Sequence, residues 1–380
     1  MSIEIAKKED YKQICEVISY CFNYGENFGE GKENSFHPEQ YIVNKINGKI
    51  TNSLRVIPYK MKFEGNYYDM GGIGGVASLP EDRSNGSIAK MLTYGIKLMN
   101  DNGYLFSALG PFSMQFYRHY GYEWAFSWQM VKVKTEDLKE FKGNYNYKSL
   151  TEKDEKTIEE VREQYIKNFN GPIYHDEEIS KEFWKQFHGQ FMHCYASYDE
   201  NNNINAVVFY KISGHLLECK RIYFLNMEGF KAMLNFFYTH RSQVEHVEFT
   251  LPTDFNIRTI LPTPRVEASI WPFMMARIIN AEKVLNILIE KHPVKAFNLK
   301  VIDENAPWNN QTFKLSNKCG ISNEEADATI TIQRLTQLAL GQISGKEALN
   351  LEIIKIHNDK CKESIENLFL KHTTMLWQEF

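Results

Sequence analysis

The sequence lacks the features of a membrane protein or of a disulfide-stabilised secreted domain. It has no run of about 18 apolar residues, which a membrane-spanning helix requires, and no leader of basic, apolar and small residues. None of its six cysteines forms a C-x-x-C pair, so no zinc motif or disulfide framework is indicated. These cysteines are Cys15, Cys21, Cys194, Cys219, Cys319 and Cys361. We therefore expect a soluble, cytoplasmic chain with reduced thiols, no metal and no membrane insertion.

The sequence also lacks an excess of positive charge. Its formal net charge is -4, which disfavours sequence-independent binding to nucleic acid, because such binding depends on clustered Lys and Arg. A cationic small molecule is the more compatible partner. The 43% of apolar and 24% of charged residues are ordinary for a globular protein, and 380 residues predict two or three domains.

Glycine is concentrated in one extended segment. Residues 54–63 alternate around Pro58, and Gly65-Asn66 separates them from a second extended run, residues 67–79, which predicts a β-hairpin. The second run contains four glycines, Gly71, Gly72, Gly74 and Gly75. Because glycine forfeits side-chain packing in a strand, this pattern predicts a β-bulge or the close approach of a ligand to the backbone.

After Pro80 the apolar spacing changes from that of a strand to that of a helix. The spacing predicts an amphipathic helix from Ile88 to about Asn102, then a buried strand over 104–110, a short helix over 111–121 and a strand over 122–133. The stretch EDRSNGSIAKML, residues 81–92, therefore lies where a strand passes into a helix. Helix N-termini bind anions, since their first N–H groups are unpaired, and Arg83 adds a charged donor. The stretch matches neither a P-loop nor G-x-G-x-x-G, and an ordinary capped loop is the alternative interpretation.

The order of two short motifs resembles the acetyl-CoA site of the GNAT N-acetyltransferases. These motifs are R-x-x-G-x at Arg83–Ser87 and FYRHYGYE at residues 116–123. The resemblance implies that the first motif binds the pyrophosphate of acetyl-CoA, that backbone amides of the preceding strand bind pantetheine and thioester, and that Tyr117 is the general acid. The implied cofactor-binding residues are Val76, Ala77, Ser78, Arg83, Ser84, Asn85, Gly86, Ser87 and Ile88. Ile88 departs from the small residue that is frequent in the family, so we expect a backbone contact there.

Segments over the rest of the chain resemble the enhanced intracellular survival (Eis) acetyltransferases. They include VEFTLPTDFNIRTILP in the middle and ADATITIQRLTQLALG near the C-terminus. The resemblance implies an α+β protein with tandem GNAT folds, each a mixed central sheet flanked by helices, and a C-terminal domain like sterol carrier protein 2. The expected domains are 1–145, 146–290 and 291–380. It also implies a homo-oligomer, a hexamer in relatives, and amine acceptors such as aminoglycosides.

The residues that handle the acceptor amine are less clearly marked. In Eis proteins the terminal carboxylate enters the active site, which implies that Phe380 is the base or positions the amine, with Glu379 attracting the ammonium. Phe22, Glu26 and Phe28 form an aromatic and acidic segment that suits a cation, although a packed loop is equally compatible. We also consider His119, beside Tyr117, as a lining residue, with a solvent-facing position as the alternative.

A binding protein is the alternative to an enzyme. The apolar segment ITIQRLTQLALG could line a lipid or sterol pocket, with the GNAT part acting only as a scaffold, but an ordinary core has the same pattern. Acetyl transfer and uptake of a fatty ligand distinguish the two functions.

Overall fold

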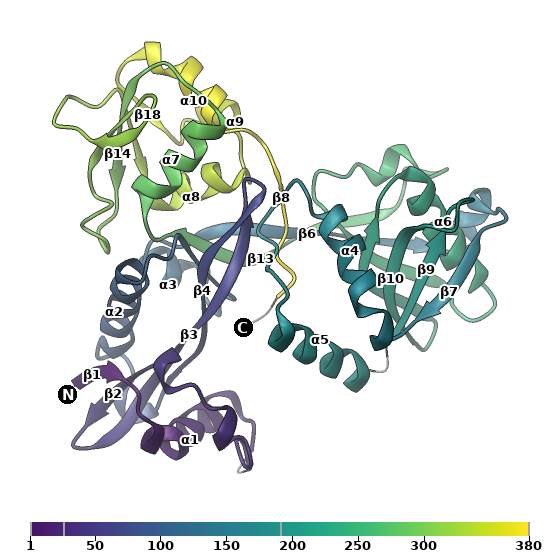
Figure 1. Ribbon diagram of the computed structural model, residues 1–380, viewed down its shortest axis with the longest axis horizontal. Coiled ribbons are helices and arrows are strands. Elements are labelled where there is room, and N and C mark those ends of the chain that lie inside the picture. The colour runs from purple at the N-terminus through teal and green to yellow at the C-terminus, as the bar shows by residue number, and fades with distance from the viewer. Residues whose placement is uncertain (1, 26, 191, 379–380) are drawn as a thin grey trace. The chain divides into compact units, whose positions relative to one another are not determined.

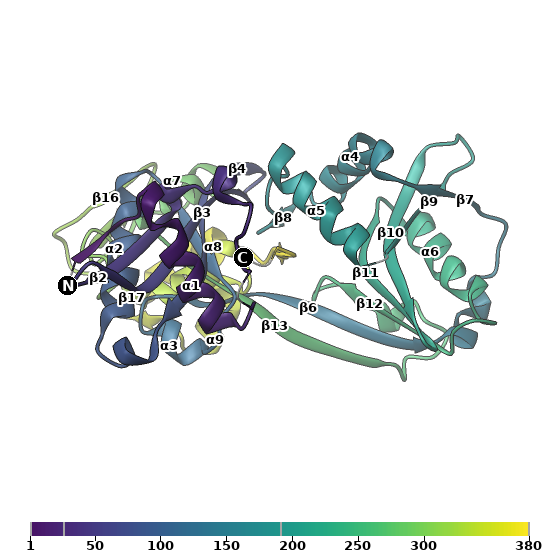
Figure 2. The same ribbon diagram turned by 90° about the horizontal axis from the view of Figure 1, so that it is seen from below.

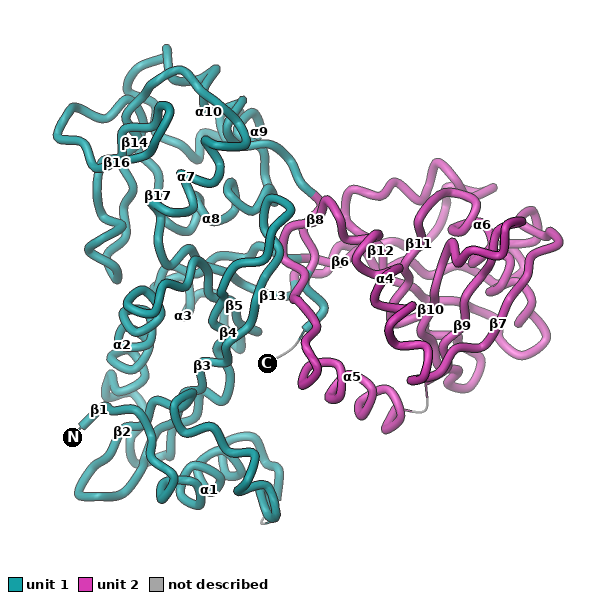
Figure 3. The backbone as a smooth tube through the Cα atoms, in the orientation of Figure 1, with its two compact units in different colours: residues 1–126, 273–372, 376–380 teal, residues 127–272, 373–375 magenta. Residues whose placement is uncertain are grey.

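The computed structural model describes the chain except for residues 1, 26, 191 and 379–380. The chain forms two compact units (Figure 3). Unit 1 contains residues 1–126, 273–372 and 376–380, and unit 2 contains residues 127–272 and 373–375. Within the described ranges, no helix combines the length and apolar character needed to cross a membrane.

The N-terminal part of unit 1 is a sheet covered by helices on both faces (Figures 1 and 2). Its strand order is β1-β2-β3-β4-β5-β13. The elements are β1 (Ser2–Ile5), α1 (Tyr11–Phe22), β2 (Tyr41–Ile46), β3 (Lys49–Phe63), β4 (Asn66–Ser78), α2 (Ser87–Asp101), β5 (Phe106–Leu109), α3 (Met114–Arg118) and β13 (Glu267–Ile278). Val43 packs in one core cluster with α1, and its neighbour Ile42 packs in another with α2. Since successive strand residues point to opposite faces, α1 and α2 cover opposite sides of the sheet.

The C-terminal part of unit 1 contains a second, five-stranded sheet with the order β16-β15-β14-β17-β18. Its elements are α7 (Ala281–Lys291), β14 (Phe297–Ile302), β15 (Thr312–Leu315), β16 (Cys319–Ile321), β17 (Ala328–Thr331), α8 (Ile332–Leu340), α9 (Gly345–Asn350), β18 (Lys355–Ile356) and α10 (Lys362–Leu368). A fully buried ion pair, Arg277 Nη2 to Asp303 Oδ2 at 2.6 Å, joins this part to β13. Arg277 also donates to the Tyr120 carbonyl, so one buried side chain ties both parts of unit 1 together.

Unit 2 is built on strands in the order β6-β12-β11-β10-β9-β7. Its elements are β6 (Glu123–Lys134), β7 (Asn146–Leu150), α4 (Glu155–Tyr165), β8 (Phe169–Asn170), α5 (Glu177–Gly189), β9 (His193–Tyr198), β10 (Ile204–Ser213), β11 (Leu216–Phe224), α6 (Met227–Thr239), β12 (His246–Leu251) and β19 (Thr373–Thr374). Helix α6 buries Phe230, Met233 and Phe237 in the core of this unit. The C-terminal strand β19 pairs in parallel with β8.

The sequence-based elements of the first region are confirmed. The hairpin is β3–β4, the helix is α2, and Gly121 follows α3 with a φ of +81°. The first hairpin strand begins at Lys49, five residues before the expected start at Leu54, because the polar run Thr51–Ser53 interrupts the alternation although it is buried. The fold class is confirmed as α+β, with parallel and antiparallel strands flanked by helices in each unit and a C-terminal part that has its own five-stranded sheet.

Candidate active site

One cavity of about 650 Å³ lies in the N-terminal part of unit 1. Residues from the end of β4, the following loop, the first turn of α2, and α3 line it, together with Phe22 from α1. Tyr117 and all nine residues that the sequence assigned to the cofactor line this cavity: Val76, Ala77, Ser78, Arg83, Ser84, Asn85, Gly86, Ser87 and Ile88. The structure therefore brings together two motifs that are about 30 residues apart in the sequence.

The strand that borders the cavity contains the bulge that its glycines predict. Ser53 lies opposite Ala77 and Arg55 lies opposite Gly74, so Gly75 and Val76 share a single partner residue on β3. Gly75 has a φ of +56°, which a residue with a Cβ adopts at a cost. The parallel pairing of β4 with β5 covers Met70–Ile73, and Gly74–Ser78 continue past the end of β5. Their backbone can therefore face a ligand on that side.

The loop between β4 and α2 has the geometry of an anion site. Gly86 occupies the N-cap of α2 with a φ of +82°, and a Cβ added there would meet nothing within 4 Å. Asn85 Oδ1 accepts from the Ser87 N–H at 2.9 Å, and the next amides of the first turn point out of the helix without an intrahelical acceptor. The exposed Arg83 side chain donates from Nε to the Ser78 carbonyl at 3.0 Å, which holds its guanidinium beside the loop.

A buried polar network connects this loop to β2 and β3. This network was not predicted from the sequence. Asp82 is 3% exposed, and its carboxylate accepts from Asn44 Nδ2 at 3.0 Å and from Thr51 Oγ1 at 2.9 Å. Asn85 also donates to this carboxylate. Asn52 Nδ2 donates to Ser78 Oγ at 2.7 Å, so the same network reaches the end of β4. The available signal was the polar run Thr51–Ser53, which is unusual within a strand that is buried.

Tyr117 lies in the wall of the cavity and is 2% exposed. Among the described residues, none forms a hydrogen bond with its hydroxyl, and the rings of Phe112 and Phe116 lie 5.3 and 5.1 Å from its own ring. Burial, and to a lesser degree the nearby Tyr122, raises the pKa of the Tyr117 phenol well above its usual value of 10.0. The hydroxyl therefore stays protonated and able to donate a hydrogen bond at physiological pH.

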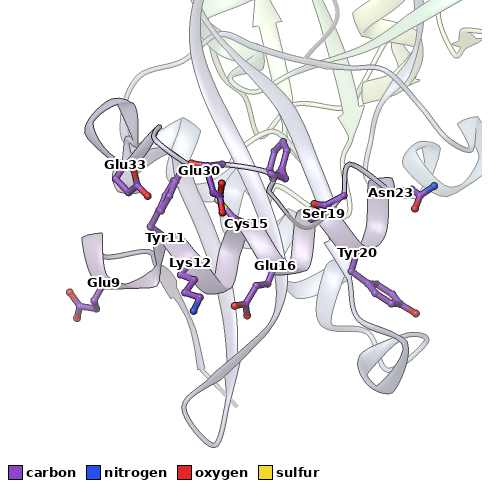
Figure 4. A pocket seen from close by; sticks show the side chains of 13 residues that line it. Glu9, Tyr11, Lys12, Cys15, Glu16, Ser19, Tyr20, Asn23, Glu30 and Glu33 are labelled. Atoms are coloured by element: carbon purple, nitrogen blue, oxygen red, sulfur yellow. Dashed lines mark hydrogen bonds between the residues drawn. The ribbon is translucent and has the colours of Figure 1, made fainter.

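The aromatic residues expected on the acceptor side form a stack. The rings of Phe22 and Tyr24 are 5.7 Å apart and nearly parallel, and those of Tyr24 and Phe28 are 4.9 Å apart. Phe22 lines the cavity of Tyr117, whereas Phe28 lines a second hollow of about 840 Å³. Figure 4 shows that hollow between α1 and the loop that carries Glu30 and Glu33. Glu9 and Glu16 line it as well.

The remaining sequence-based site residues are not gathered in this cavity. His119 is exposed beyond the end of α3, and its carbonyl accepts from Asn305 Nδ2 at 2.8 Å. It does not line the cavity of Tyr117. Glu26, Glu379 and Phe380 lie outside the described residues, so their expected roles stay predictions.

Comparison with protein families identifies three domains. Two segments, residues 2–125 and 173–278, each match a model described as an acetyltransferase (GNAT) domain. Residues 279–377 match a sterol carrier protein domain. No curated protein sequence matches the chain significantly.

Solved structures with the same fold cover the whole chain. They include a probable N-acyltransferase of unknown function from Enterococcus faecalis V583, with 23% identity, a TM-score of 0.86, and coverage of 100% of this chain and 99% of that one. A GCN5-related N-acetyltransferase from Anabaena variabilis has 17% identity and a TM-score of 0.86, and Eis1 from Mycobacterium abscessus has 13% and 0.81; both alignments cover 100% of each chain. The chain is therefore an acetyltransferase with two GNAT domains and a C-terminal sterol carrier protein domain, and it shares the fold of Eis-type proteins.

Proposed function

We propose that unit 1 transfers an acetyl group from acetyl-CoA directly to a primary amine of a small cationic acceptor, such as an aminoglycoside or a polyamine. The observation that carries this proposal is the single cavity in which the bulged strand, the Arg83–Ser87 loop and Tyr117 meet. These are the parts that acetyl transfer requires: a pyrophosphate site, backbone donors for the thioester, and a hydrogen-bond donor for the leaving sulfur. No metal is needed for any of these steps.

The loop and the strand would hold the cofactor. In this proposal the pyrophosphate accepts hydrogen bonds from amides of the loop and the first turn of α2, with Arg83 contributing charge. Amides of Val76, Ala77 and Ser78 donate to pantetheine and to the thioester oxygen. An oxyanion that develops on this oxygen is stabilised by donors that are already oriented, and this stabilisation lowers the barrier to transfer.

Tyr117 would act on the leaving group. The amine nitrogen bonds to the thioester carbon, the C–S bond breaks, and the proton lost by the amine completes the CoA thiol. Because burial raises the pKa of Tyr117, giving up its proton entirely to the thiolate is unfavourable. We therefore propose that Tyr117 donates a hydrogen bond to the departing sulfur, rather than transferring its proton as a general acid.

The acceptor amine would be bound by aromatic and acidic groups. The exposed rings of Phe22 and Tyr24 suit a cation, and the glutamates around Phe28 add negative charge. The α-carboxylate of Phe380 is the candidate that positions the amine or accepts its proton through water. A short tag added after Phe380 should then reduce turnover by orders of magnitude without changing the affinity for acetyl-CoA. Full activity of the tagged protein would remove this carboxylate from the mechanism.

Thiol release from acetyl-CoA, measured with a panel of amines, tests the proposed reaction. Amine-dependent release supports it, with the acetylated product identified by mass spectrometry. No release with any amine, together with stoichiometric uptake of a fatty ligand, would instead support the lipid-carrier alternative. A cytoplasmic location and a homo-oligomeric, hexameric assembly are also part of the proposal, and light scattering of the purified protein tests the assembly.

A further inference from the structure

Three side chains from distant parts of the sequence converge in unit 1, away from the cavity of Tyr117. Glu64 lies in the turn between β3 and β4, His292 directly follows α7, and His372 follows α10. Figure 1 shows the tip of the β3–β4 hairpin reaching the segment that follows α10. Glu64 Oε2 lies 3.3 Å from His292 Nε2, and Glu64 Oε1 lies 3.2 Å from His372 Nε2.

Each of these separations, one to each carboxylate oxygen of Glu64, is close to that between two ligands of one metal ion. Bonds of about 2.0–2.1 Å that meet at the tetrahedral angle of Zn²⁺ place two donor atoms roughly 3.3 Å apart. One donor atom from each of the three residues lies within 4.8 Å of the other two. Two imidazoles and one carboxylate are also a ligand set that Zn²⁺ uses, with water in the fourth position.

The imidazole of His372 gives an independent indication. Its Nε2 atom is buried and has no hydrogen-bond partner in the described part of the chain, although a carboxylate oxygen is only 3.2 Å away. The half-buried His240 is different, since Phe236 and Tyr210 lie within hydrogen-bond distance of its two ring nitrogens. A buried polar atom without a partner costs free energy, and a metal ion bonded to the Nε2 lone pair would remove that cost.

The backbone around the three residues fixes their approach. Gly341 has a φ of +81°, and a Cβ added there would lie 2.6 Å from the Cβ of His372. The His372 N–H also donates to the Gly341 carbonyl at 3.0 Å. Glu64 itself has a φ of +48°, which is uncommon for a residue with a side chain. The Glu64 and His372 side chains therefore meet where Glu64 has a left-handed backbone and where the backbone of Gly341 lies close to His372.

We propose that Glu64, His292 and His372 bind one divalent transition-metal ion of the Zn²⁺ class, with water completing the coordination. The ion joins the β3–β4 hairpin of the acetyltransferase domain to both ends of the sterol carrier domain. It also fixes the residue directly before β19, at the start of the C-terminal tail. This site is separate from the proposed transfer reaction, and no step of that reaction passes through it.

Metal titration of the full-length protein tests the site. After treatment with a chelator and its removal, ZnCl₂ should bind with one equivalent per chain in calorimetry and raise the midpoint of thermal unfolding. Co²⁺ should give the visible absorption bands of a tetrahedral N/O site. Neither readout requires acetyltransferase activity, so failure of the site and failure of the proposed function remain distinguishable.

Substitutions of the ligands locate the binding. His372→Ala, His292→Ala and the isosteric Glu64→Gln should each weaken Zn²⁺ binding by about 100-fold or more, because each removes one of three protein ligands. Glu64→Gln covers the case in which a histidine variant fails to fold. His215→Ala, at an exposed turn of unit 2, should bind Zn²⁺ like the parent. The proposal is overturned if the parent binds no stoichiometric Zn²⁺, or if a folded ligand variant binds it with unchanged affinity.

Discussion

The two units contain the same sequence of elements with different junctions. In unit 1 the hairpin β3–β4 leads into α2, and β5 returns parallel to β4. In unit 2 the hairpin β10–β11 leads into α6, and β12 returns parallel to β11. The connection before the helix spans residues 79–86 in unit 1 but only residues 225–226 in unit 2.

The helix N-termini differ accordingly. Gly86 caps α2 without a side chain and is open around its Cα. Asn226 caps α6 with its own side chain, which accepts from the Gly229 N–H at 2.8 Å. A Cβ on Gly229 would lie 2.3 Å from the Asn205 carbonyl oxygen, so this helix end packs directly on β10. The same fold therefore leaves the helix N-terminus open in unit 1 and packed against a strand in unit 2.

The segments after the returning strands also differ. Helix α3 with Tyr117 follows β5, whereas a single 3-10 turn, Ile257–Thr259, follows β12 in unit 2. The proposed cofactor site of unit 1 thus rests on the length and capping of one loop and on one following helix, and unit 2 differs in both. These differences support the proposal that acetyl transfer takes place in unit 1.

Tyr117→Phe should have the largest effect on activity. It removes the phenol hydroxyl on α3, for which unit 2 has no counterpart after β12. We expect kcat to fall about 100-fold with unchanged affinity for CoA, since a preorganised hydrogen-bond donor to developing negative charge contributes roughly 100-fold or more. Steady-state kinetics and calorimetry measure the two quantities. Tyr104→Phe, in the same unit but away from the cavity, serves as the control and should retain the parent kcat. Equal kcat in both variants would exclude a role for the Tyr117 hydroxyl.

Gly86→Asp should make the junction of unit 1 as unfavourable for a phosphate as that of unit 2. Left-handed backbone costs a residue with a Cβ about 1–2 kcal/mol, and the new carboxylate repels the pyrophosphate. We expect CoA affinity to fall on the order of 30-fold in calorimetry. Gly214→Asp introduces the same residue at a positive φ, +58°, in the β10–β11 turn. Its CoA affinity should equal that of the parent, and a comparable loss there would point to a general effect of strain.

Asp82→Ala and Asn226→Ala compare the side chains that hold the connections before α2 and before α6. Loss of the buried Asp82 carboxylate removes an acceptor that Asn44, Thr51 and Asn85 share, so we expect a loss of about 2–3 kcal/mol of stability and about 10-fold weaker CoA binding. Asn226→Ala removes one helix cap and should cost about 1 kcal/mol without changing CoA affinity. Denaturant unfolding and calorimetry measure these effects. Unchanged CoA affinity in a folded Asp82→Ala protein would show that the Asp82 network does not support CoA binding.

Acid should destabilise unit 2 through the hydrogen-bonded pair of His175 and the half-buried Glu159, and this effect should be the smallest of those predicted. Burial, and then Arg162, lower the pKa of His175, and hydrogen bonding to His175 helps to lower the pKa of Glu159 despite its burial. The folded state therefore binds fewer protons than the unfolded state. The contribution of His175 to stability is fully present above the ordinary imidazole pKa of about 6.5 and is lost as the pH falls below it, because the unfolded chain then binds a proton. Glu159 adds a further loss below about 4.5 for the same reason.

The His175→Gln variant tests this dependence. Its thermal midpoint should vary less between pH 6.5 and 5 than that of the parent, as followed by fluorescence. An equally steep pH dependence in the variant would assign the effect to other groups.

Local patterns in the sequence predicted much of unit 1. The spacing of apolar residues, the glycines and the turn residues indicated the β3–β4 hairpin, its bulge and α2. These elements are predictable because their conformation depends on residues that are close together in the sequence. The Asp82 network was not predictable in this way, since its members lie on β2, β3 and the loop after β4 and meet only in the folded protein. Glu64, His292 and His372 are farther apart still, so the expectation of no metal site rested on local spacing alone.

The structure of the protein with bound CoA tests the central claim most directly. We predict that the pyrophosphate contacts backbone amides of residues 84–88 beside Arg83, with the sulfur within hydrogen-bond distance of the Tyr117 hydroxyl and no CoA at the start of α6. CoA bound at the α6 junction of unit 2, or in unit 1 with its pyrophosphate away from this loop, would contradict the account.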